Sequence, residues 1–445
     1  MPELEVRPVA GPLAAVVRPP GSKSITNRAL VCAALARGRS RIDGVLVADD
    51  TGAMVGCLRD LGVGVTIDAD AGRAEVIGVA GEPPVVGAVL DARLSGTTSR
   101  FVAPLATLVR GTVVLDGAAP LRRRPMGDLL DALSALGAGV EPLGEPGHLP
   151  VRISSGRTGR TGGAGLAGGT VAIAGDVSSQ FLSGLLLSAP CFRDGLDVRL
   201  STPLVSRPYV ELTIDVMAAF GAPVEVDDDW STLRVPPLGY RAVDPYRVEP
   251  DASAASYFAA AAALVGGTVR IDGLGRGSRQ GDIRFIDLLG RMGAEVSWED
   301  GAVEVRGTGV LRGITADMSD ISDTAQTLAA VAPFASSPTT VTGIGFIRGK
   351  ETDRVAAVVT ELRRLGVAAS EDPDGFTVRP GRPTAGSVRT YDDHRMAMSF
   401  ALLGLRVPGI RIQDPGCVAK TYPGFWEDLD SIRPEASPGP TSPTP

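Results

Sequence analysis

The sequence predicts an α/β protein of two domains, each made of three copies of one structural unit. Three observations carry this prediction: the chain has 445 residues, 44% of them are hydrophobic, and two short sequence signatures recur along it. Because single hydrophobic cores stop growing near about 250–300 residues, a chain of this length is expected to form at least two. Repeated units of this kind bury their apolar faces by stacking on neighbouring copies.

The first signature is an apolar helix that ends in a turn and leads into a short alternating strand closing on glycine. Clear copies close at Gly44, Gly117, Gly273 and Gly343. Weaker copies follow Phe192 and Arg406, which completes a set spaced roughly 70–80 residues apart, three in each half of the chain.

The second signature interleaves with the first and consists of an amphipathic helix that ends in a Gly turn and leads into another strand. Its copies lie at residues 58–67, 133–142, 217–226, 289–298 and 362–370. Each unit is therefore expected to run helix, strand, helix, strand, with short turns between the elements.

The domain boundaries follow from where the periodicity fails. Residues 239–250 contain two prolines and lose the pattern, so we expect the chain to cross between domains there. The first domain is then expected at 20–240 and the second at 241–430 together with 1–19. Residues 431–445 are expected to form a disordered tail, because Ser437–Pro445 contains only Pro, Ser, Gly and Thr.

Composition argues against several classes of function. The formal net charge is -7 and no basic block occurs, so the electrostatic footprint of a nucleic-acid binder is missing. The four cysteines lie far apart and there are only two histidines, which argues against a zinc site and for a reducing compartment. Without a leader pattern or a long apolar run, a cytoplasmic protein with no membrane partner is expected.

Polar residues collect where the first helix of each unit is expected to begin. These clusters lie at 20–30, 95–108, 175–187, 250–264, 321–334 and 391–403. For any single cluster, helix capping by Ser, Thr or Asp is a sufficient explanation, worth about 1 kcal/mol. Six equivalent clusters also permit a second explanation. The helix starts of each domain would converge on an anion-binding surface, and two such surfaces would form a cleft.

Basic side chains at these helix starts favour anion binding. Lys23 lies in a Gly-Ser-Lys-Ser turn, with Ser24 and Arg28 one helical turn apart on the same face. The turn is not a phosphate loop for nucleoside triphosphates, because that pattern requires Gly where this chain has Ser22. Residues 273–281 have the wrong Gly spacing for a dinucleotide site and are interpreted as a turn.

Two further charged segments are less decisive by themselves. Lys350, Glu351 and Arg354 share one helical turn, and a solvated face with ion pairs explains them as well as catalysis does. Arg395, however, runs directly into an apolar helix, where an unpaired charge is costly, so we expect it to meet an anion.

Nine motifs taken in order resemble those of the 5-enolpyruvylshikimate-3-phosphate synthase family, over nearly the whole chain to about Trp426. They are PGSKSITNRAL, LSGTTSRF, RRRPM, DVSSQFLSGLL, SRPYVELT, ISDTAQT, RGKETDR, YDDHRMAM and VAKTYPGF. The resemblance implies an inside-out α/β barrel fold of two domains, each with three βαβαββ repeats in pseudo-threefold symmetry. It also implies transfer of the enolpyruvyl group of phosphoenolpyruvate to the 5-hydroxyl of shikimate 3-phosphate, with no metal or cofactor, in chorismate and aromatic amino-acid biosynthesis.

The same resemblance implies the site residues. Shikimate 3-phosphate would be held by Lys23, Ser24, Arg28, Ser178, Ser179, Gln180, Ser206, Asp323 and Lys350, with Tyr209 close by. Phosphoenolpyruvate would be held by Lys23, Gly96, Arg124, Gln180, Arg354, Arg395 and Lys420. Asp323 would be the general base, Glu351 the acid at the methylene carbon, and Lys23 a stabiliser of the departing phosphate. Phe346 and Phe101 depart from the family pattern, since many relatives carry Asn and Pro at those positions.

Two other interpretations remain open. One is an enolpyruvyl transferase that acts on UDP-N-acetylglucosamine, which resembles this fold but relies on a loop cysteine. The other is a non-catalytic anion-binding protein, which predicts damage to the set Asp323, Glu351 and Lys23, all present in the chain. A monomer is the expected state, because one chain supplies every residue of the site.

Overall fold

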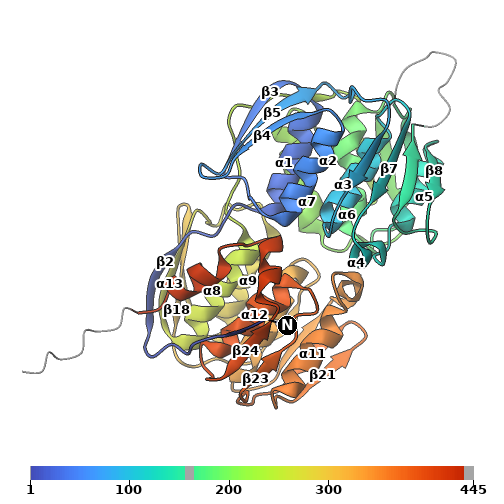
Figure 1. Cartoon of the computed structure of the whole chain (residues 1–445). Coiled ribbons are helices and arrows are strands. Elements are labelled where there is room, and N and C mark those ends of the chain that lie inside the picture. The colour runs from blue at the N-terminus through green and yellow to red at the C-terminus, as the bar shows by residue number, and fades with distance from the viewer. Residues whose placement is uncertain (1, 156–164, 435–445) are drawn as a thin grey trace, which may run out of the picture.

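The structure is a computed structural model that describes residues 2–155 and 165–434. Figure 1 shows two lobes, an upper one coloured blue to green and a lower one coloured yellow to red. Six sheets form the outer parts of these lobes in the described chain. The prediction of a mixed α/β fold built from repeated units is confirmed.

Each sheet contains one strand from the first sequence signature. These strands are β3 (Ala36–Asp43), β7 (Thr112–Asp116), β11 (Leu196–Leu200), β16 (Gly267–Asp272), β20 (Thr339–Thr342) and β24 (Ile410–Gln413). The second signature supplies antiparallel hairpins to five of the sheets. The hairpins are β4 (Gly64–Asp68) with β5 (Arg73–Val79), β8 (Gly139–Pro142) with β9 (Val151–Ser154), β12 (Glu225–Val226) with β13 (Thr232–Val235), β17 (Glu295–Glu299) with β18 (Ala302–Gly307), and β21 (Ala369–Asp372) with β22 (Gly375–Val378).

A parallel strand completes each sheet, and two sheets take it from a distant part of the chain. The local ones are β6 (Ala88–Asp91), β10 (Gly169–Ile173), β19 (Thr315–Asp317) and β23 (Gly386–Val388). The strand β3 instead pairs with β14 (Tyr240–Arg241) and β15 (Tyr246–Arg247), and β16 pairs with β2 (Leu13–Val17). The strand β1 (Glu3–Glu5) pairs with β24. Figure 1 shows β2, in blue, beside the elements of the lower lobe.

The chain therefore passes between the lobes twice, and the two passages are bonded to each other. The amide of Ser22 donates to the carbonyl of Glu249 at 2.8 Å, and the amide of Asp251 donates to the carbonyl of Pro20 at 2.8 Å. The two passages form a short double-stranded connection next to the first turns of the helices that follow them.

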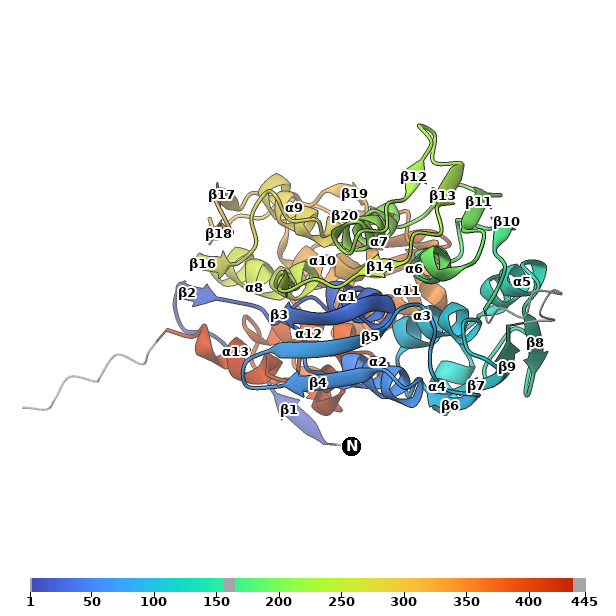
Figure 2. The same ribbon diagram turned by 90° about the horizontal axis from the view of Figure 1, so that it is seen from above.

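The view from above in Figure 2 shows β3, β5 and β4 side by side on one face of the molecule.

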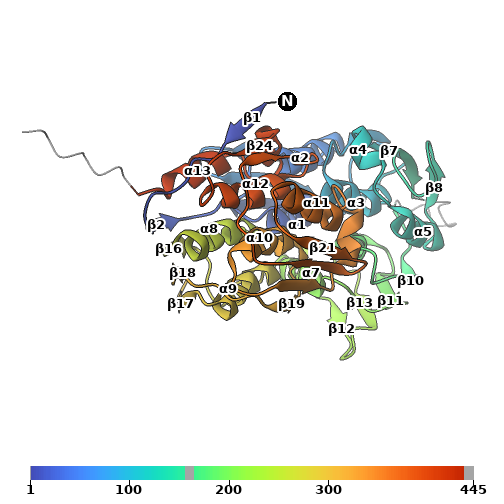
Figure 3. The same ribbon diagram turned by 90° about the horizontal axis from the view of Figure 1, so that it is seen from below.

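Three buried helices lie inside each lobe and contact one another. They are α1 (Lys23–Leu35), α3 (Gly96–Ala106) and α6 (Ser179–Ser188) in one lobe, and α8 (Ala252–Val265), α10 (Ala325–Val331) and α12 (His394–Gly404) in the other. Figure 3 shows the second set from below. The remaining helices are α2 (Asp49–Asp60), α4 (Ala119–Arg122), α5 (Gly127–Ala135), α7 (Arg207–Ala219), α9 (Phe285–Met292), α11 (Arg354–Arg364) and α13 (Phe425–Ser431). Short 3-10 turns include η2 (Gly281–Arg284), η3 (Ser322–Thr324), η5 (Gly345–Gly349) and η6 (Pro415–Lys420).

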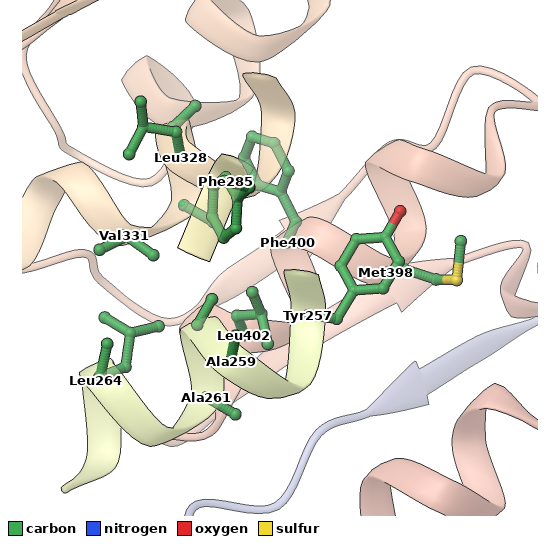
Figure 4. Packing of buried hydrophobic residues seen from close by; sticks show 14 of the residues in the cluster. Tyr257, Ala259, Ala261, Leu264, Phe285, Leu328, Val331, Met398, Phe400 and Leu402 are labelled. Carbon is green, nitrogen blue, oxygen red and sulfur yellow. The ribbon is translucent and has the colours of Figure 1, made fainter. Parts of the chain in front are cut away.

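The composition of these inner helices explains their position. The helix α8 reads ASAASYFAAAAALV, which is apolar on all sides and has no solvent-facing stripe. Its small alanines allow α10 and α12 to approach closely, as the packing of Ala259 and Leu402 in Figure 4 shows. Phe285 and Phe400 fill the space that the alanines leave.

Two separate hydrophobic clusters result. One lies between Ile25 and Val248, and the other joins residues 6–17 to residues 252–432. The domain boundaries at 19/20 and 240/241 remain a proposal. The first cluster includes Val248, and β15 pairs with β3, so the packing of the first lobe continues past residue 240. Helix α13 ends at Ser431 and Ile432 is buried, so the packed chain continues past residue 430. The rest of the predicted tail, 435–445, lies outside the described residues. In the described part of the chain, none of the helices is long and apolar enough to cross a membrane.

Candidate active site

A polar cavity of about 250 Å³ lies between the two lobes. The first lobe lines it with residues at the starts of α1, α3, α6 and α7, and the second lobe with residues of η3 and η5. The predicted site residues that line it are Lys23, Ser24, Arg28, Arg124, Ser178, Ser179, Gln180, Ser206, Asp323 and Lys350, together with Tyr209 and Phe346. The helix starts of the first lobe thus meet at one cleft, whereas the starts of α8 and α12 do not line this cavity.

Capping and cleft lining are divided between neighbouring residues. The side chains of Ser22, Ser95 and Ser178 accept hydrogen bonds from the first amides of α1, α3 and α6. Asp251 and Asp393 do the same for α8 and α12. Lys23 and Gln180 lie inside the first turns, so their side chains can face the cleft while a neighbour caps the helix. Capping explains five of the six polar clusters, and anion binding at the cleft stays a prediction.

Asp323 is held by three cations. Its carboxylate oxygens lie 2.9 Å from Lys350 Nζ, 3.1 Å from Arg354 Nη1 and 2.8 Å from Arg395 Nη2. Burial alone would raise the pKa of Asp323, but Arg395, Lys350 and Arg354 outweigh it and hold the pKa well below its usual range. Asp323 is therefore a carboxylate, and it is the anion that Arg395 meets in this structure.

Glu351 is the second carboxylate, and its partners come from both lobes. Its oxygens lie 2.8 Å from Arg354 Nη2, 3.0 Å from Lys420 Nζ and 3.3 Å from Arg124 Nη1. Burial again acts to raise the pKa of Glu351, and Lys420, Arg124 and Arg354 again prevail and lower it well below its usual range. The surrounding cations therefore favour the ionised form of Glu351 in the ligand-free chain.

Arg354 joins the two carboxylates. Its Nη1 and Nη2 atoms donate to Asp323 and Glu351, and its Nε atom donates to the buried Asp393 at 2.8 Å. Only 2% of its side chain is exposed. The segment around Lys350, Glu351 and Arg354 is therefore no solvated surface face.

Arg28 lines the cavity, and Gly96, which does not line it, lies next to Arg124. Arg28 donates to the hydroxyl of Thr213 at 2.8 Å and to the carbonyl of Ser24 at 2.9 Å, and it lies over the ring of Phe101. Burial lowers the pKa of Arg28 to about 10, so it stays charged at neutral pH. A Cβ atom on Gly96 would lie 2.4 Å from Arg124 Nη1, so the absence of a side chain makes room for that guanidinium.

Several lining residues were not predicted as ligands. Arg100 and Thr97 line the cavity beside Gly96, and Gln180 Nε2 donates to the Thr97 hydroxyl at 3.3 Å. A basic residue one turn after Gly96 on an apolar helix was the available signal for Arg100. Lys23 Nζ lies 3.4 Å from Asp50 Oδ2, a pairing that no local pattern indicates. The segment 273–281 is a turn, as predicted.

No metal centre is apparent from the side chains. Within residues 2–155 and 165–434, no group of three or more His, Cys, Asp or Glu side chains is arranged to hold a metal ion. The arrangement instead offers two ionised carboxylates among five cationic side chains: Lys350, Arg354, Arg395, Lys420 and Arg124. Such a site can bind a ligand with several negative charges and exchange protons with it.

Comparison with known proteins places this chain in a family. The family model described as EPSP synthase (3-phosphoshikimate 1-carboxyvinyltransferase) matches residues 9–429. The 3-phosphoshikimate 1-carboxyvinyltransferase of Nostoc punctiforme is 44% identical over 96% of this chain and 98% of its own. That of Methanoculleus marisnigri is 44% identical over 94% of this chain and 97% of its own.

Solved structures agree in fold. The EPSP synthase of Acinetobacter baumannii superposes with a TM-score of 0.80 at 26% identity, over 97% of this chain and 98% of that one. The enolpyruvyl transferase NikO of Streptomyces tendae, at 21% identity, shares the fold with a TM-score of 0.75 over 97% of this chain and 96% of that one. Since the family model and these relatives span nearly the whole chain, the chain belongs to the EPSP synthase (3-phosphoshikimate 1-carboxyvinyltransferase) family.

Proposed function

We propose that this chain transfers the enolpyruvyl group of phosphoenolpyruvate to the 5-hydroxyl of shikimate 3-phosphate and releases phosphate. The observation that carries the proposal is a pair of carboxylates held among cations where the two lobes meet. Asp323 lines the cavity, and Glu351 pairs with Arg124 of the first lobe at 3.3 Å. Both substrates are multiply charged anions, and the reaction needs one group to accept a proton and another to donate one. The family membership supplies the identity of the two substrates.

The first substrate is proposed to lie against the hydroxyl and amide groups of the first lobe. Ser178, Ser179, Gln180 and Ser206 would bond its hydroxyls and phosphate, together with Lys23, Ser24, Arg28, Asp323 and Lys350. Lys350 Nζ lies 5.8 Å from the centre of the Phe346 ring, so Phe346 offers an apolar surface where many relatives carry an amide.

Phosphoenolpyruvate is proposed to take over part of the cation network. Its phosphate and carboxylate would meet Lys23, Gly96, Arg124, Gln180, Arg354, Arg395 and Lys420. Arg124 and Lys420 contact Glu351 in the ligand-free chain. When an anion draws these two cations away from Glu351, the pKa of that carboxyl rises and it can carry a proton.

The proposed chemistry is an addition followed by an elimination. Asp323 accepts the proton of the 5-hydroxyl while the hydroxyl oxygen attacks C2 of phosphoenolpyruvate. Glu351 gives a proton to the methylene carbon, and a tetrahedral adduct forms. Glu351 then takes a proton back from the methyl group, the bond between C2 and the phosphate oxygen breaks, and the enolpyruvyl ether remains. Lys23 and the arginines stabilise the charge that moves onto the departing phosphate.

Two alternatives are not favoured. A transferase acting on UDP-N-acetylglucosamine would use a loop cysteine, and none of Cys32, Cys57, Cys191 and Cys417 lines the cleft cavity. A non-catalytic binder would have no need to hold both carboxylates ionised where the two lobes meet. The monomeric state and cytoplasmic location stay predictions.

The test is phosphate release by the purified chain with phosphoenolpyruvate and one acceptor at a time. Release that requires shikimate 3-phosphate supports the proposal. Release with UDP-N-acetylglucosamine alone would transfer the assignment to the first alternative, and tight binding of both ligands without release would favour the second.

The space at Gly96 gives a separate prediction. In Gly96→Ala the new Cβ would lie 2.4 Å from Arg124 Nη1 and 2.5 Å from Arg100 Nη1, both flexible side-chain ends that can move. We expect the KM for phosphoenolpyruvate to rise by about 10-fold through the displaced Arg124, with the fold intact. Steady-state kinetics with each substrate varied in turn measures this effect.

The matched control is Gly56→Ala, in α2 of the same lobe, where a Cβ would meet no heavy atom within 4 Å. Its KM values should match those of the unchanged chain. An unchanged KM for phosphoenolpyruvate in Gly96→Ala would contradict the placement of that ligand beside Arg124.

A further inference from the structure

One buried carboxyl lies next to the proposed base but outside the ion-pair network. Asp282 lies in η2 and is 5% exposed. Its Oδ2 atom accepts a hydrogen bond from the Tyr209 hydroxyl at 2.6 Å, and its Oδ1 atom has no partner among the described residues. The Tyr209 hydroxyl also lies 3.3 Å from Asp323 Oδ2. Tyr209 therefore stands between two carboxyl groups, one from each of two neighbouring turns.

The number of protons in this chain of groups decides what it can do. A phenol has one proton to donate, whereas two ionised carboxylates offer only acceptors. If both are ionised, Tyr209 can satisfy Asp282 at 2.6 Å but not Asp323. One additional proton, shared between the carboxyls, would make both contacts good hydrogen bonds. The group of Asp282, Tyr209 and Asp323 has room for one more proton than it holds when fully ionised.

Charge determines where that proton rests. Asp323 is neutralised by Lys350, Arg354 and Arg395, and a proton on Asp323 would leave these cations without their counter-ion. In the described part of the chain, Asp282 has no ion-pair partner within 4.0 Å. Burial raises the pKa of Asp282 to about 7, and the negative charge of Asp323 adds to the effect. Burial also raises the pKa of Tyr209 well above its usual range, so it remains a hydrogen-bond donor.

The surroundings of Asp282 include a small enclosed space that could carry protons further. Its volume is about 10 Å³, close to the volume one water molecule needs. The charged groups that face it with Asp282 are Lys23 from α1, Asp251 at the start of α8 and Arg395 from α12. Arg284 and Asp287, on η2 and α9, are exposed. Asp282 thus has both a polar path to the cleft, through Tyr209, and a polar space behind it.

We propose that Asp282 is a positioning residue that acts through Tyr209. It receives, through the Tyr209 hydroxyl, the proton that Asp323 takes from the 5-hydroxyl of the acceptor. The inference rests on the proposed function, because it needs Asp323 to be the base. The substrate O–H bond breaks and an O–H bond forms on Asp323 Oδ2. That proton then passes to Tyr209 Oη while the phenol proton passes to Asp282 Oδ2.

The transfer leaves Asp323 ionised and Asp282 neutral, with no electrons exchanged beyond those of the O–H bonds. Asp323 therefore keeps neutralising Lys350, Arg354 and Arg395 while the adduct exists. After product release Asp282 gives its proton to solvent and the released phosphate takes one up, so the overall reaction is unchanged.

The test compares kcat against pH in the unchanged chain, Asp282→Asn, Tyr209→Phe and the double variant, with Asp287→Asn as the matched control on an exposed neighbour. In the unchanged chain kcat should fall as pH drops below about 7, because protonated Asp282 cannot accept the proton. In both single variants we expect this acidic limb of the kcat–pH profile to disappear and kcat to fall by roughly 10- to 100-fold. The double variant should be no slower than the slower single one, because both act in one path.

A second readout separates proton transfer from structure. Infrared spectra should show the carbonyl band of a protonated carboxylic acid that appears as pH is lowered through neutrality, and this band should be absent from Asp282→Asn but present in Asp287→Asn. The dissociation constants of the unchanged chain, Asp282→Asn and Asp287→Asn for shikimate 3-phosphate should stay within a few-fold of each other. If Asp282→Asn folds poorly, Tyr209→Phe retains the infrared band and still tests the kinetic limb.

The outcomes are distinguishable. An Asp282→Asn enzyme that keeps the acidic limb overturns the relay, whether its kcat is normal or reduced. Failure of the unchanged chain to release phosphate with shikimate 3-phosphate would instead overturn the proposed function, before any variant is compared.

Discussion

Replacing Glu351 by glutamine is expected to lower kcat by roughly 10²- to 10⁴-fold while the chain remains folded. Glutamine keeps the shape of the side chain and one carbonyl oxygen, so Lys420 and Arg124 retain an acceptor at distances near the present 3.0 and 3.3 Å. It cannot give a proton to the methylene carbon or take one back from the methyl group. Both halves of the proposed reaction therefore lose their proton carrier.

Single-turnover and steady-state phosphate release measure this effect. The loss should appear in kcat, whereas KM for phosphoenolpyruvate should change little or decrease, because Arg124 and Lys420 are freed from a negative charge. Glu299→Gln is a suitable control, since Glu299 is 52% exposed and pairs with Arg270 on the surface. A Glu351→Gln enzyme with kcat within threefold of the unchanged chain would remove Glu351 from the proposed acid role.

Much of the fold could be predicted because each repeat carries its own local signals. The alternating strand before Gly117 and the amphipathic helix before Gly137 are readable without reference to the rest of the chain. The partner of β2 could not be read in this way, because nothing in residues 13–17 specifies the edge of β16, more than 250 residues away. Sheet completion by distant strands depends on which edge is left open once the other units have folded.

The site shows the same division between local and long-range information. The motifs placed Asp323, Glu351 and Lys350 in the site through resemblance, and their ligand contacts stay predictions. Which cations surround each carboxylate was not available from the sequence, because Arg124 and Lys420 reach Glu351 from positions more than 60 residues away on either side. Asp282 was missed for a further reason: it directly follows a segment correctly interpreted as a turn, and its burial arises from contacts with distant segments, among them the hydrogen bond from Tyr209.

Arg354 is the residue whose loss should cost the most stability. Its guanidinium donates to Asp323, Glu351 and Asp393, and the Asp393 side chain is completely buried. In Arg354→Met the alkyl stem is kept but three carboxylates lose a common counter-ion. Removing one partner of a buried ion pair costs about 3–5 kcal/mol, because the remaining charge is left uncompensated. We expect a loss of this size, measured by urea denaturation followed by circular dichroism.

Arg363→Met is the matched control, on the same helix but exposed, with one hydrogen bond to the carbonyl of Ala369. Its cost should stay near or below about 1 kcal/mol. Equal urea midpoints for Arg354→Met and Arg363→Met would show that Arg354 is not the counter-ion that keeps these carboxylates ionised.

The pH dependence of the stability lost in Arg354→Met shows whether unpaired charge causes that loss. In the unchanged chain the pKa values of Asp323 and Glu351 are lowered, so their contribution to stability is present above the unfolded carboxyl pKa and is lost as pH falls through the folded values. In Arg354→Met, Asp323 keeps Lys350 and Arg395 and Glu351 keeps Lys420 and Arg124, so the pKa values of both carboxyls should be lowered less than in the unchanged chain. The difference in stability between the two chains should therefore be largest at neutral pH and should shrink as pH falls below the usual carboxyl pKa of about 4. A difference that grew toward low pH would mean that the cost of Arg354→Met comes from lost packing rather than from unpaired charge.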